Sequence, residues 1–155
     1  MANTVAERLK SLGIDLPQPP KPVASYVGFV RHGDLVFVSG QLPLVEGMLT
    51  MSGLLGRNVT IEQGAEAARI CAINLLAQVS AACGGDLERV IRCVRLGGFV
   101  ACVPEFTDHP KVVNGASNLI GDVLGESGAH ARAAVGVPSL PLNACVEVDA
   151  VFATN

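Results

Sequence analysis

Residues 144–152 read Ala-Cys-Val-Glu-Val-Asp-Ala-Val-Phe, and this alternation of apolar and acidic side chains is typical of a half-covered β-strand. The period of two places Glu147 and Asp149 on the same side of the strand, roughly 7 Å apart, with the valines on the other side. One of these carboxylates could serve as a base. The residues alone favour the simpler interpretation, in which the two acids form the solvated face of the strand.

Other strands are predicted upstream of this one, from runs rich in β-branched residues between turn signals. His32-Gly33-Asp34 is predicted to join the first two as a hairpin, and Gly97-Gly98 suggests a bulge in a longer strand. We expect the strands at residues 26–31, 35–39, around 48–51, 87–103, 131–137 and 144–152.

Helices are predicted in three places. A short one covers residues 3–12, with Asn3 as the possible cap. The longest begins after Thr60, which can form a capping box with Gln63, and it ends at Gly84-Gly85. The third covers residues 105–124, with Pro110 in its first turn.

The order of these elements predicts an α/β (α+β) fold with a mixed β-sheet and two helices packed on one face. Residues 1–22 form a separate N-terminal helix and Pro-rich connector, and residues 23–155 form a single domain. The other face of the sheet needs a cover, and further copies of the chain are the obvious one, so we expect a homo-oligomer.

The composition excludes several classes of protein. Of the 155 residues, 50% are hydrophobic and 16% are charged, and no apolar run is long enough to span a membrane. The charged pair Glu7-Arg8 falls where a signal peptide would be apolar, so we expect a cytoplasmic protein without a membrane partner. The net charge of −3 and the aromatic content of 4% make nucleic acid a poor partner. The five cysteines include no CxxC pair, which predicts reduced and mostly buried thiols.

Motifs for nucleotide binding, for serine hydrolases and for zinc proteases are absent from the sequence. The three histidines are separated from one another without metal-ligand spacing. We therefore expect neither a metal nor a cofactor. The histidines are predicted to be solvated residues of loops or helix ends (His32, His109 and His130).

Arg132 opens a predicted strand whose other residues are small or apolar. A guanidinium in such surroundings either binds a carboxylate ligand or pairs with an acid, and an intersubunit salt bridge to Glu147 or Asp149 is the interpretation that composition favours. Ser39-Gly40-Gln41 can offer donors to a small anion or can simply form a turn. Tyr26 and Asn114 would ordinarily be assigned to packing or capping.

Several segments taken together resemble the RidA/YjgF family. Residues 36–43 (VFVSGQLP) correspond to its SGQ[IL]P element, and Tyr26 lies upstream as in the family. Residues 131–137 (ARAAVGV), Leu140-Pro141 and residues 146–150 (VEVDA) follow in the order that is specific to it. The resemblance covers most of the chain, from about residue 23 to residue 153.

The resemblance implies a chorismate-mutase-like fold (bacillus type), assembled as a homotrimer with ligand clefts between subunits. It also implies hydrolysis of reactive 2-imino or enamine acids to 2-keto acids and ammonia, without a cofactor. By this resemblance Arg132 holds the substrate carboxylate and Glu147 positions or activates water, and the remaining cleft residues are Tyr26, Ser39, Gly40, Asn114 and Ala134. Ala134 stands where many members carry a cysteine, so only its backbone N–H can contact the ligand.

Two other functions remain open. The trimer could bind small carboxylates or keto acids in these clefts without catalysis and act as a sensor. A ribonuclease, as many such proteins are labelled, ranks last because the chain is acidic and poor in aromatic residues.

Overall fold

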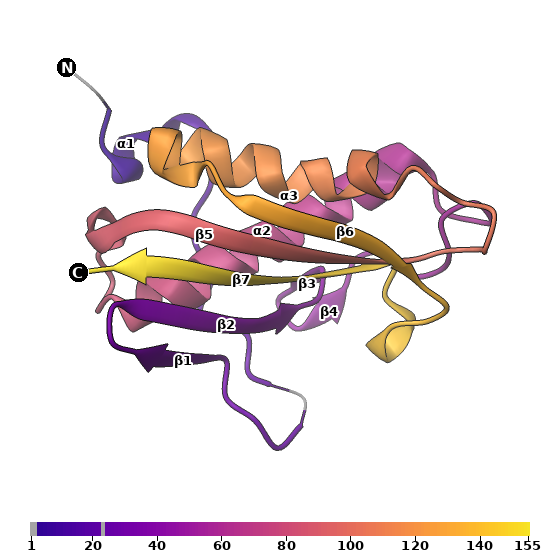
Figure 1. Ribbon diagram of the computed structural model, residues 1–155, viewed down its shortest axis with the longest axis horizontal. Helices are drawn as coiled ribbons and strands as arrows, with labels where there is room; N and C mark the ends of the chain where they lie inside the picture. The colour runs from indigo at the N-terminus through magenta and orange to yellow at the C-terminus, as the bar shows by residue number, and fades with distance from the viewer. Residues whose placement is uncertain (1–2, 23) are drawn as a thin grey trace.

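The centre of the molecule is a five-stranded mixed sheet with the strand order β1-β2-β7-β5-β6 (Figure 1). The strands β5 and β6 pair in parallel, and all other neighbours are antiparallel. A separate two-stranded hairpin consists of β3 (Leu44–Val45) and β4 (Met48–Leu49). The five strands of the main sheet are β1 (Phe29–His32), β2 (Leu35–Gln41), β5 (Val90–Ala101), β6 (Ala131–Val137) and β7 (Val146–Thr154).

This computed structural model describes residues 3–22 and 24–155. Val23, where the sequence prediction starts the main domain, lies outside the described residues. Three short 3-10 helices connect the main elements: η1 (Leu87–Arg89), η2 (Gly125–Gly128) and η3 (Pro141–Asn143).

Strand β7 has the alternation that the sequence predicts. Val146, Val148 and Phe152 are fully buried, whereas Glu147 and Asp149 are only partly covered. The buried residues face the helices, since the thiol of Cys71 on the helix α2 (Ile61–Ala82) contacts the backbone oxygen of Val146. The half-covered strand that the sequence predicts near the C-terminus is β7, and it is the middle strand of the five-stranded sheet.

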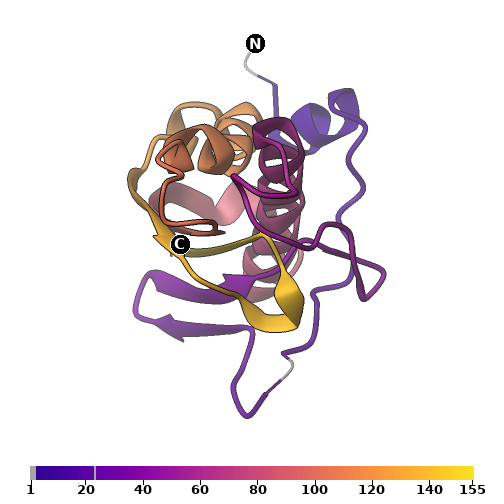
Figure 2. The same cartoon turned by 90° about the vertical axis from the view of Figure 1, so that its right-hand side faces the viewer.

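Two helices pack on the same face of the sheet, as predicted (Figure 2). The helix α2 (Ile61–Ala82) begins with the expected capping box between Thr60 and Gln63. The helix α3 (His109–Leu124) begins four residues later than the sequence prediction, immediately before Pro110. Proline suits the first helical turn because it has no N–H to donate.

The N-terminal helix α1 (Val5–Ser11) packs beside the end of α3, where the guanidinium of Arg8 donates to the backbone oxygen of Val123 over 3.2 Å. Its N-cap is Thr4 rather than Asn3, because Thr4 forms a capping box with Glu7. The helix prediction is therefore right, and the predicted cap is wrong by one residue.

The register of β5 corrects the prediction of a bulge at Gly97-Gly98. The register shifts lie nearer the start of the strand, between Val90 and Arg92 and between Cys93 and Arg95. The two glycines have a packing role instead: a Cβ at Gly98 would lie 2.5 Å from a methyl of Val113 on α3, and one at Gly97 would overlap the Asp149 carboxylate.

The boundaries of the other predicted strands also move. Strand β1 starts at Phe29, so Tyr26 precedes the sheet, and the short strand expected around residues 48–51 is the hairpin partner β4. Strand β7 extends two residues beyond Phe152, to Thr154.

The face of the sheet away from the helices carries exposed apolar side chains. Phe37 is 46% exposed and Val135 is 47% exposed, and Val30 is paired with Phe37 in the same row. We call this surface the open face. The sequence prediction that one sheet face lacks an intramolecular cover is thereby confirmed.

Two further expectations concern the chain as a whole. Within residues 3–22 and 24–155, no helix has the length and apolar content required to cross a lipid bilayer. All five cysteines are free thiols, and all except Cys102 are buried.

The contact between α2 and α3 leads to a prediction about two glycines of α3. A methyl group at Gly115 would overlap the backbone oxygen of Ala65 on α2, whereas a methyl group at Gly121 meets no other atom within 4 Å. We expect Gly115→Ala to lower the free energy of unfolding by about 2 kcal/mol, as overpacking does. The matched control Gly121→Ala is expected to raise it by about 0.5–1 kcal/mol through helix propensity. Urea denaturation of both variants measures the difference, and equal effects would contradict the close helix contact.

Candidate functional site

Arg132 lies near the start of the edge strand β6 and points toward α3. It is paired with the buried Leu96 on β5, and residues at this register position face the helices. Its Nη1 donates to Asn114 Oδ1 over 2.8 Å and to Ser117 Oγ over 3.0 Å. Because α3 holds both acceptors, the guanidinium is fixed between β6 and α3.

This arrangement leaves one edge of the guanidinium available. Within the described residues, Nε and Nη2 of Arg132 have no hydrogen-bond partner, and no carboxylate lies within 4 Å of them. Within the chain, Asp149 pairs with Arg95 over 3.3 Å. The free edge presents two parallel N–H donors, which is the geometry that binds a carboxylate in bidentate fashion.

His130 continues the same hydrogen-bond network. Its Nε2 lies 2.9 Å from Ser117 Oγ, and its Nδ1 lies 2.6 Å from the backbone oxygen of Gly128. The prediction of a solvated loop histidine is therefore wrong for His130, which is half-buried and bonded through both ring nitrogens. His109 opens α3, a helix end as the sequence predicts, but it is also partly buried and its Nε2 contacts the thiol of Cys102.

Glu147 lies on the opposite face of the sheet from Arg132. It pairs with Phe99 in the register, and its side chain packs against Gly40, where any Cβ would overlap the carboxylate. Partial burial raises the pKa of the Glu147 carboxyl, and the neighbouring Asp149 carboxylate raises it further. Glu147 is therefore a stronger base than an ordinary surface glutamate.

Ser39 and Tyr26 lie close to Gly40. The Ser39 hydroxyl donates to the backbone oxygen of Val27 over 2.6 Å, so its proton is used within the chain and its oxygen remains an acceptor. Tyr26 and Gly40 line a small cavity of about 30 Å³, together with Gln78, which bonds the Pro20 backbone oxygen.

The predicted site residues therefore form two groups within one chain. The Arg132 group consists of Arg132, Asn114 and Ala134, which is opposite Gly98 on the helix side of β6. The Glu147 group consists of Tyr26, Ser39, Gly40 and Glu147 around β2 and β7. The strand β5 and the thickness of the sheet separate the two groups, so they do not meet in a single copy of the chain.

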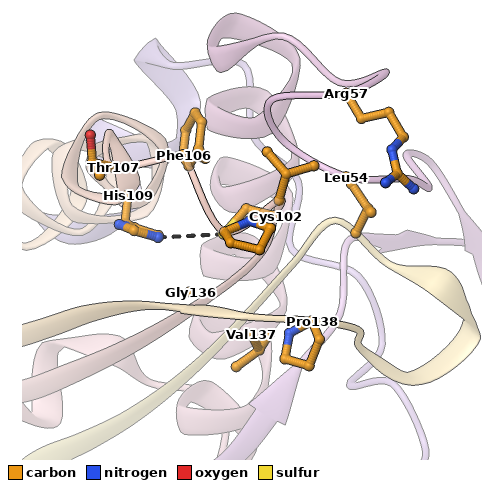
Figure 3. Close-up of a pocket in the computed structure, with 11 residues that line it drawn as sticks. Leu54, Arg57, Cys102, Phe106, Thr107, His109, Gly136, Val137 and Pro138 are labelled. Atoms are coloured by element: carbon orange, nitrogen blue, oxygen red, sulfur yellow. Dashed lines mark hydrogen bonds between the residues drawn. The ribbon is translucent and has the colours of Figure 1, made fainter.

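A larger cavity of about 540 Å³ opens where β5 and β6 end (Figure 3). His109 and Cys102 lie on one wall with the Nε2–Sγ distance at 3.4 Å, and Arg57 lies across from them. Partial burial raises the pKa of the Cys102 thiol. Most of the other lining residues are apolar: Leu54, Val103, Pro104, Phe106, Val137 and Pro138.

A family model described as "YjgF/chorismate_mutase-like, putative endoribonuclease" matches residues 6–154. The chain belongs to this family. Among its relatives is Protein TCP17 of Trypanosoma cruzi, which is 48% identical over 97% of this chain and 94% of its own. The mixed sheet with helices on one face is therefore the YjgF/chorismate-mutase-like fold, as the sequence motifs predict.

Two solved structures superpose closely on this chain. The Agrobacterium tumefaciens protein Atu1372 is 52% identical with a TM-score of 0.92, and the match covers 97% of this chain and 92% of that one. A Shewanella oneidensis protein, described as a candidate endoribonuclease, is 33% identical with a TM-score of 0.93, and the match covers 97% and 99% of the two chains.

Two residues of the network were missed by the sequence analysis. Ser117 is three residues after Asn114 and so lies on the same face of α3. His130 precedes Arg132 by two residues, which puts both side chains on the same side of an extended segment. These spacings can be read from the sequence. They indicate a shared hydrogen-bond network only once α3 and β6 are known to be neighbours.

The raised pKa of Glu147 leads to a prediction for stability. The folded state binds a proton at Glu147 more readily than the unfolded state, so an ionised Glu147 destabilises the fold at neutral pH. We expect Glu147→Gln to raise the melting temperature at pH 8, and the gain to shrink as the pH falls through the raised pKa toward the unfolded value of about 4.3. Thermal unfolding from pH 4 to pH 8 measures this trend.

Asp149→Asn is the control for this series. It removes the repulsion between the two carboxylates but also the ion pair with Arg95, so we expect its gain at pH 8 to be smaller than that of Glu147→Gln. A lower melting temperature of Glu147→Gln at pH 8 would show that the Glu147 carboxylate is not destabilising.

Proposed function

We propose that this protein hydrolyses reactive 2-imino or enamine acids to 2-keto acids and ammonia. The observation that carries the proposal is the Arg132 guanidinium, which two acceptors on α3 hold while its Nε–Nη2 edge is left for a carboxylate. A bidentate anchor fixes a small 2-imino acid in a defined orientation, which accounts for much of the catalysis of a reaction with an already electrophilic carbon.

The chemistry requires one water and one base. Glu147 accepts a proton from water as the water oxygen bonds to the imine carbon, and it passes this proton to the imine nitrogen, which gives a neutral carbinolamine. Glu147 then takes the proton of the carbinolamine hydroxyl and delivers it to the amino group. The C–N bond breaks as the carbonyl forms, ammonia leaves, and Glu147 is again a carboxylate. The raised pKa of Glu147 favours this role, because a carboxylate with higher proton affinity takes a proton from water more readily. No cofactor is needed in this sequence of steps.

The two groups of site residues require a second copy of the chain. Since Arg132 faces α3 and Glu147 is on the open face, a single cleft can contain both only if it lies between copies. The exposed apolar side chains of the open face provide a surface for such an assembly, and a homotrimer is the arrangement that the family resemblance implies. The partner of the protein in this proposal is therefore itself, with an imino or keto acid as ligand.

The cavity beside His109 gives the substrate room beyond the carboxylate. His109 precedes Asn114 by five residues on α3, a rise of about 7.5 Å along the helix. We infer that imino acids with side chains of several carbons are accommodated along α3, toward the apolar wall formed by Phe106 and Val137.

One alternative is favoured by a specific observation. The Arg132 group is complete in a single chain and does not include Glu147, so it could bind keto acids without catalysis. The endoribonuclease description of the family is a weaker alternative, because a chain with a net charge of −3 and one tyrosine offers little to an RNA backbone or to bases.

The test of the proposal is the release of keto acid and ammonia from imines generated in situ by an amino-acid oxidase. Precursors from alanine to leucine cover small and larger side chains. We expect the protein to accelerate hydrolysis above the spontaneous rate, Arg132→Ala to abolish the acceleration, and Arg132→Lys to retain about a tenth or less of it, because a point charge replaces a planar fork.

Arg69→Ala is the matched control, since this arginine pairs with Glu66 on the exposed side of α2. It should retain full activity. If the protein binds keto acids but accelerates the hydrolysis of no imine, the proposal of keto-acid binding without catalysis replaces that of an enzyme. Normal turnover by Arg132→Lys would remove Arg132 from the anchoring role.

Assembly and activity are expected to be lost together. Phe37→Glu places a charge in the apolar open face and should give a monomer that does not hydrolyse imines, as measured by sedimentation and the coupled assay. Met48→Glu on the β3–β4 hairpin, at a side chain that is 72% exposed, is the control and should change neither. A fully active monomer would contradict an intersubunit cleft.

A further inference from the structure

The hydrogen bonds around Arg132 form a chain that ends on the protein backbone. From the guanidinium it passes through the Ser117 hydroxyl and the His130 ring to the backbone oxygen of Gly128, over distances of 3.0, 2.9 and 2.6 Å. The family resemblance implicates Arg132, but it does not implicate Ser117, His130 or Gly128.

The direction of each bond in this chain follows from the chemistry of its ends. The Gly128 oxygen can only accept, so Nδ1 of His130 carries the proton and donates it. In the tautomer with its only proton on Nδ1, the ring has a lone pair on Nε2, which accepts from the Ser117 hydroxyl. Because the guanidinium can only donate, the Ser117 oxygen accepts from Arg132 Nη1. Every donor and acceptor in the chain is satisfied in one consistent direction, and such bonds polarise one another.

The end of the chain is rigid. Gly128 is buried against α3, where a Cβ would lie 2.6 Å from the backbone oxygen of Ile120 and 2.8 Å from the Cα of Gly121. The carbonyl that orients His130 is therefore held by the same helix that carries Ser117 and Asn114. The His130 ring, the Ser117 hydroxyl and the Arg132 guanidinium are thus all positioned by α3.

We propose that Ser117 and His130 are positioning residues, which hold Nη1 of Arg132 so that the Nε–Nη2 edge faces the carboxylate of the substrate. This inference rests on the proposed function for the identity of the ligand. Asn114 alone would leave the guanidinium one acceptor on α3, and rotation about that single bond would turn the fork away from its ligand. The second acceptor prevents the rotation, and His130 keeps the Ser117 oxygen in the orientation that accepts.

The experiment compares Ser117→Ala with Ser117→Thr. The alanine variant removes the acceptor, and the threonine variant keeps a hydroxyl. We expect Ser117→Ala to raise the KM for imino acids and the Kd for 2-oxobutanoate by about tenfold, as loss of a hydrogen bond to a charged group does, with kcat changed less than about twofold. Ser117→Thr should restore both constants, which a purely structural role would not require.

His130 is tested by a second pair of variants. His130→Gln keeps an acceptor for the Ser117 hydroxyl and should lie near the wild type, whereas His130→Ala should resemble Ser117→Ala. Asn118→Ala, at the next and exposed position of α3, is the control and should change nothing. Nitrogen-15 spectra of the arginine side chains provide a readout that needs no ligand: the Arg132 Nη signals should show slowed rotation in the wild type and faster rotation in Ser117→Ala.

The outcomes separate the two proposals. Weakened 2-oxobutanoate binding and faster guanidinium rotation in Ser117→Ala, with no imine hydrolysis by the wild type, would overturn the deaminase and retain the positioning role. Imine hydrolysis by the wild type with unchanged KM, Kd and spectra in Ser117→Ala would overturn the positioning role and retain the deaminase. A wild-type protein that neither hydrolyses imines nor binds 2-oxobutanoate would overturn both the deaminase proposal and the positioning proposal.

Discussion

The close approach of α3 to the sheet and to α2 is the constraint on which the Arg132 site depends, and two positions without side chains permit it. At Gly98, on β5, a Cβ would lie 2.5 Å from the Val113 side chain, and at Gly115, on α3, it would overlap the backbone of α2. Asn114 lies between these two contacts in the sequence of α3. The packing that brings the helix down onto β5 therefore also brings the Asn114 amide within reach of Arg132 on the neighbouring strand.

The elements that the sequence predicts well are those whose signals are local. The alternation in residues 144–152 identifies β7, and the Thr60–Gln63 pair identifies the start of α2, because both signals arise from neighbours in the chain. The order of strands and helices was also sufficient to predict a mixed sheet with one covered face. The role of Gly97-Gly98 was not predictable, because the atoms that exclude side chains there belong to α3 and β7.

The candidate site shows the same division between local and non-local information. The motifs identified Arg132, Glu147 and the other site residues together. They did not show which face of the sheet each side chain is on, because this depends on the register of the strands. Arg132 is level with Leu96 and Glu147 is level with Phe99, so their positions on β5 differ by an odd number of residues, and the two side chains lie on opposite faces. Neither strand contains this information by itself. The hydrogen bond between His130 and Ser117 was hidden for a related reason, since it joins a loop to a helix that ends before it.

The opposite placement of the two groups has a consequence for the electrostatics of a shared cleft. In a single chain, burial and the Asp149 carboxylate both raise the pKa of Glu147, and the guanidinium of Arg95 is paired with Asp149. In the proposed assembly, covering the open face would remove more water from Glu147 and raise its pKa further, whereas the approach of Arg132 from another copy would lower it. A substrate carboxylate that occupies the Nε–Nη2 edge neutralises Arg132 and so removes the lowering influence. Binding of the carboxylate would therefore itself make Glu147 a stronger base at the moment when water must be deprotonated, which links the anchoring of the substrate to the activation of water without any movement of the chain.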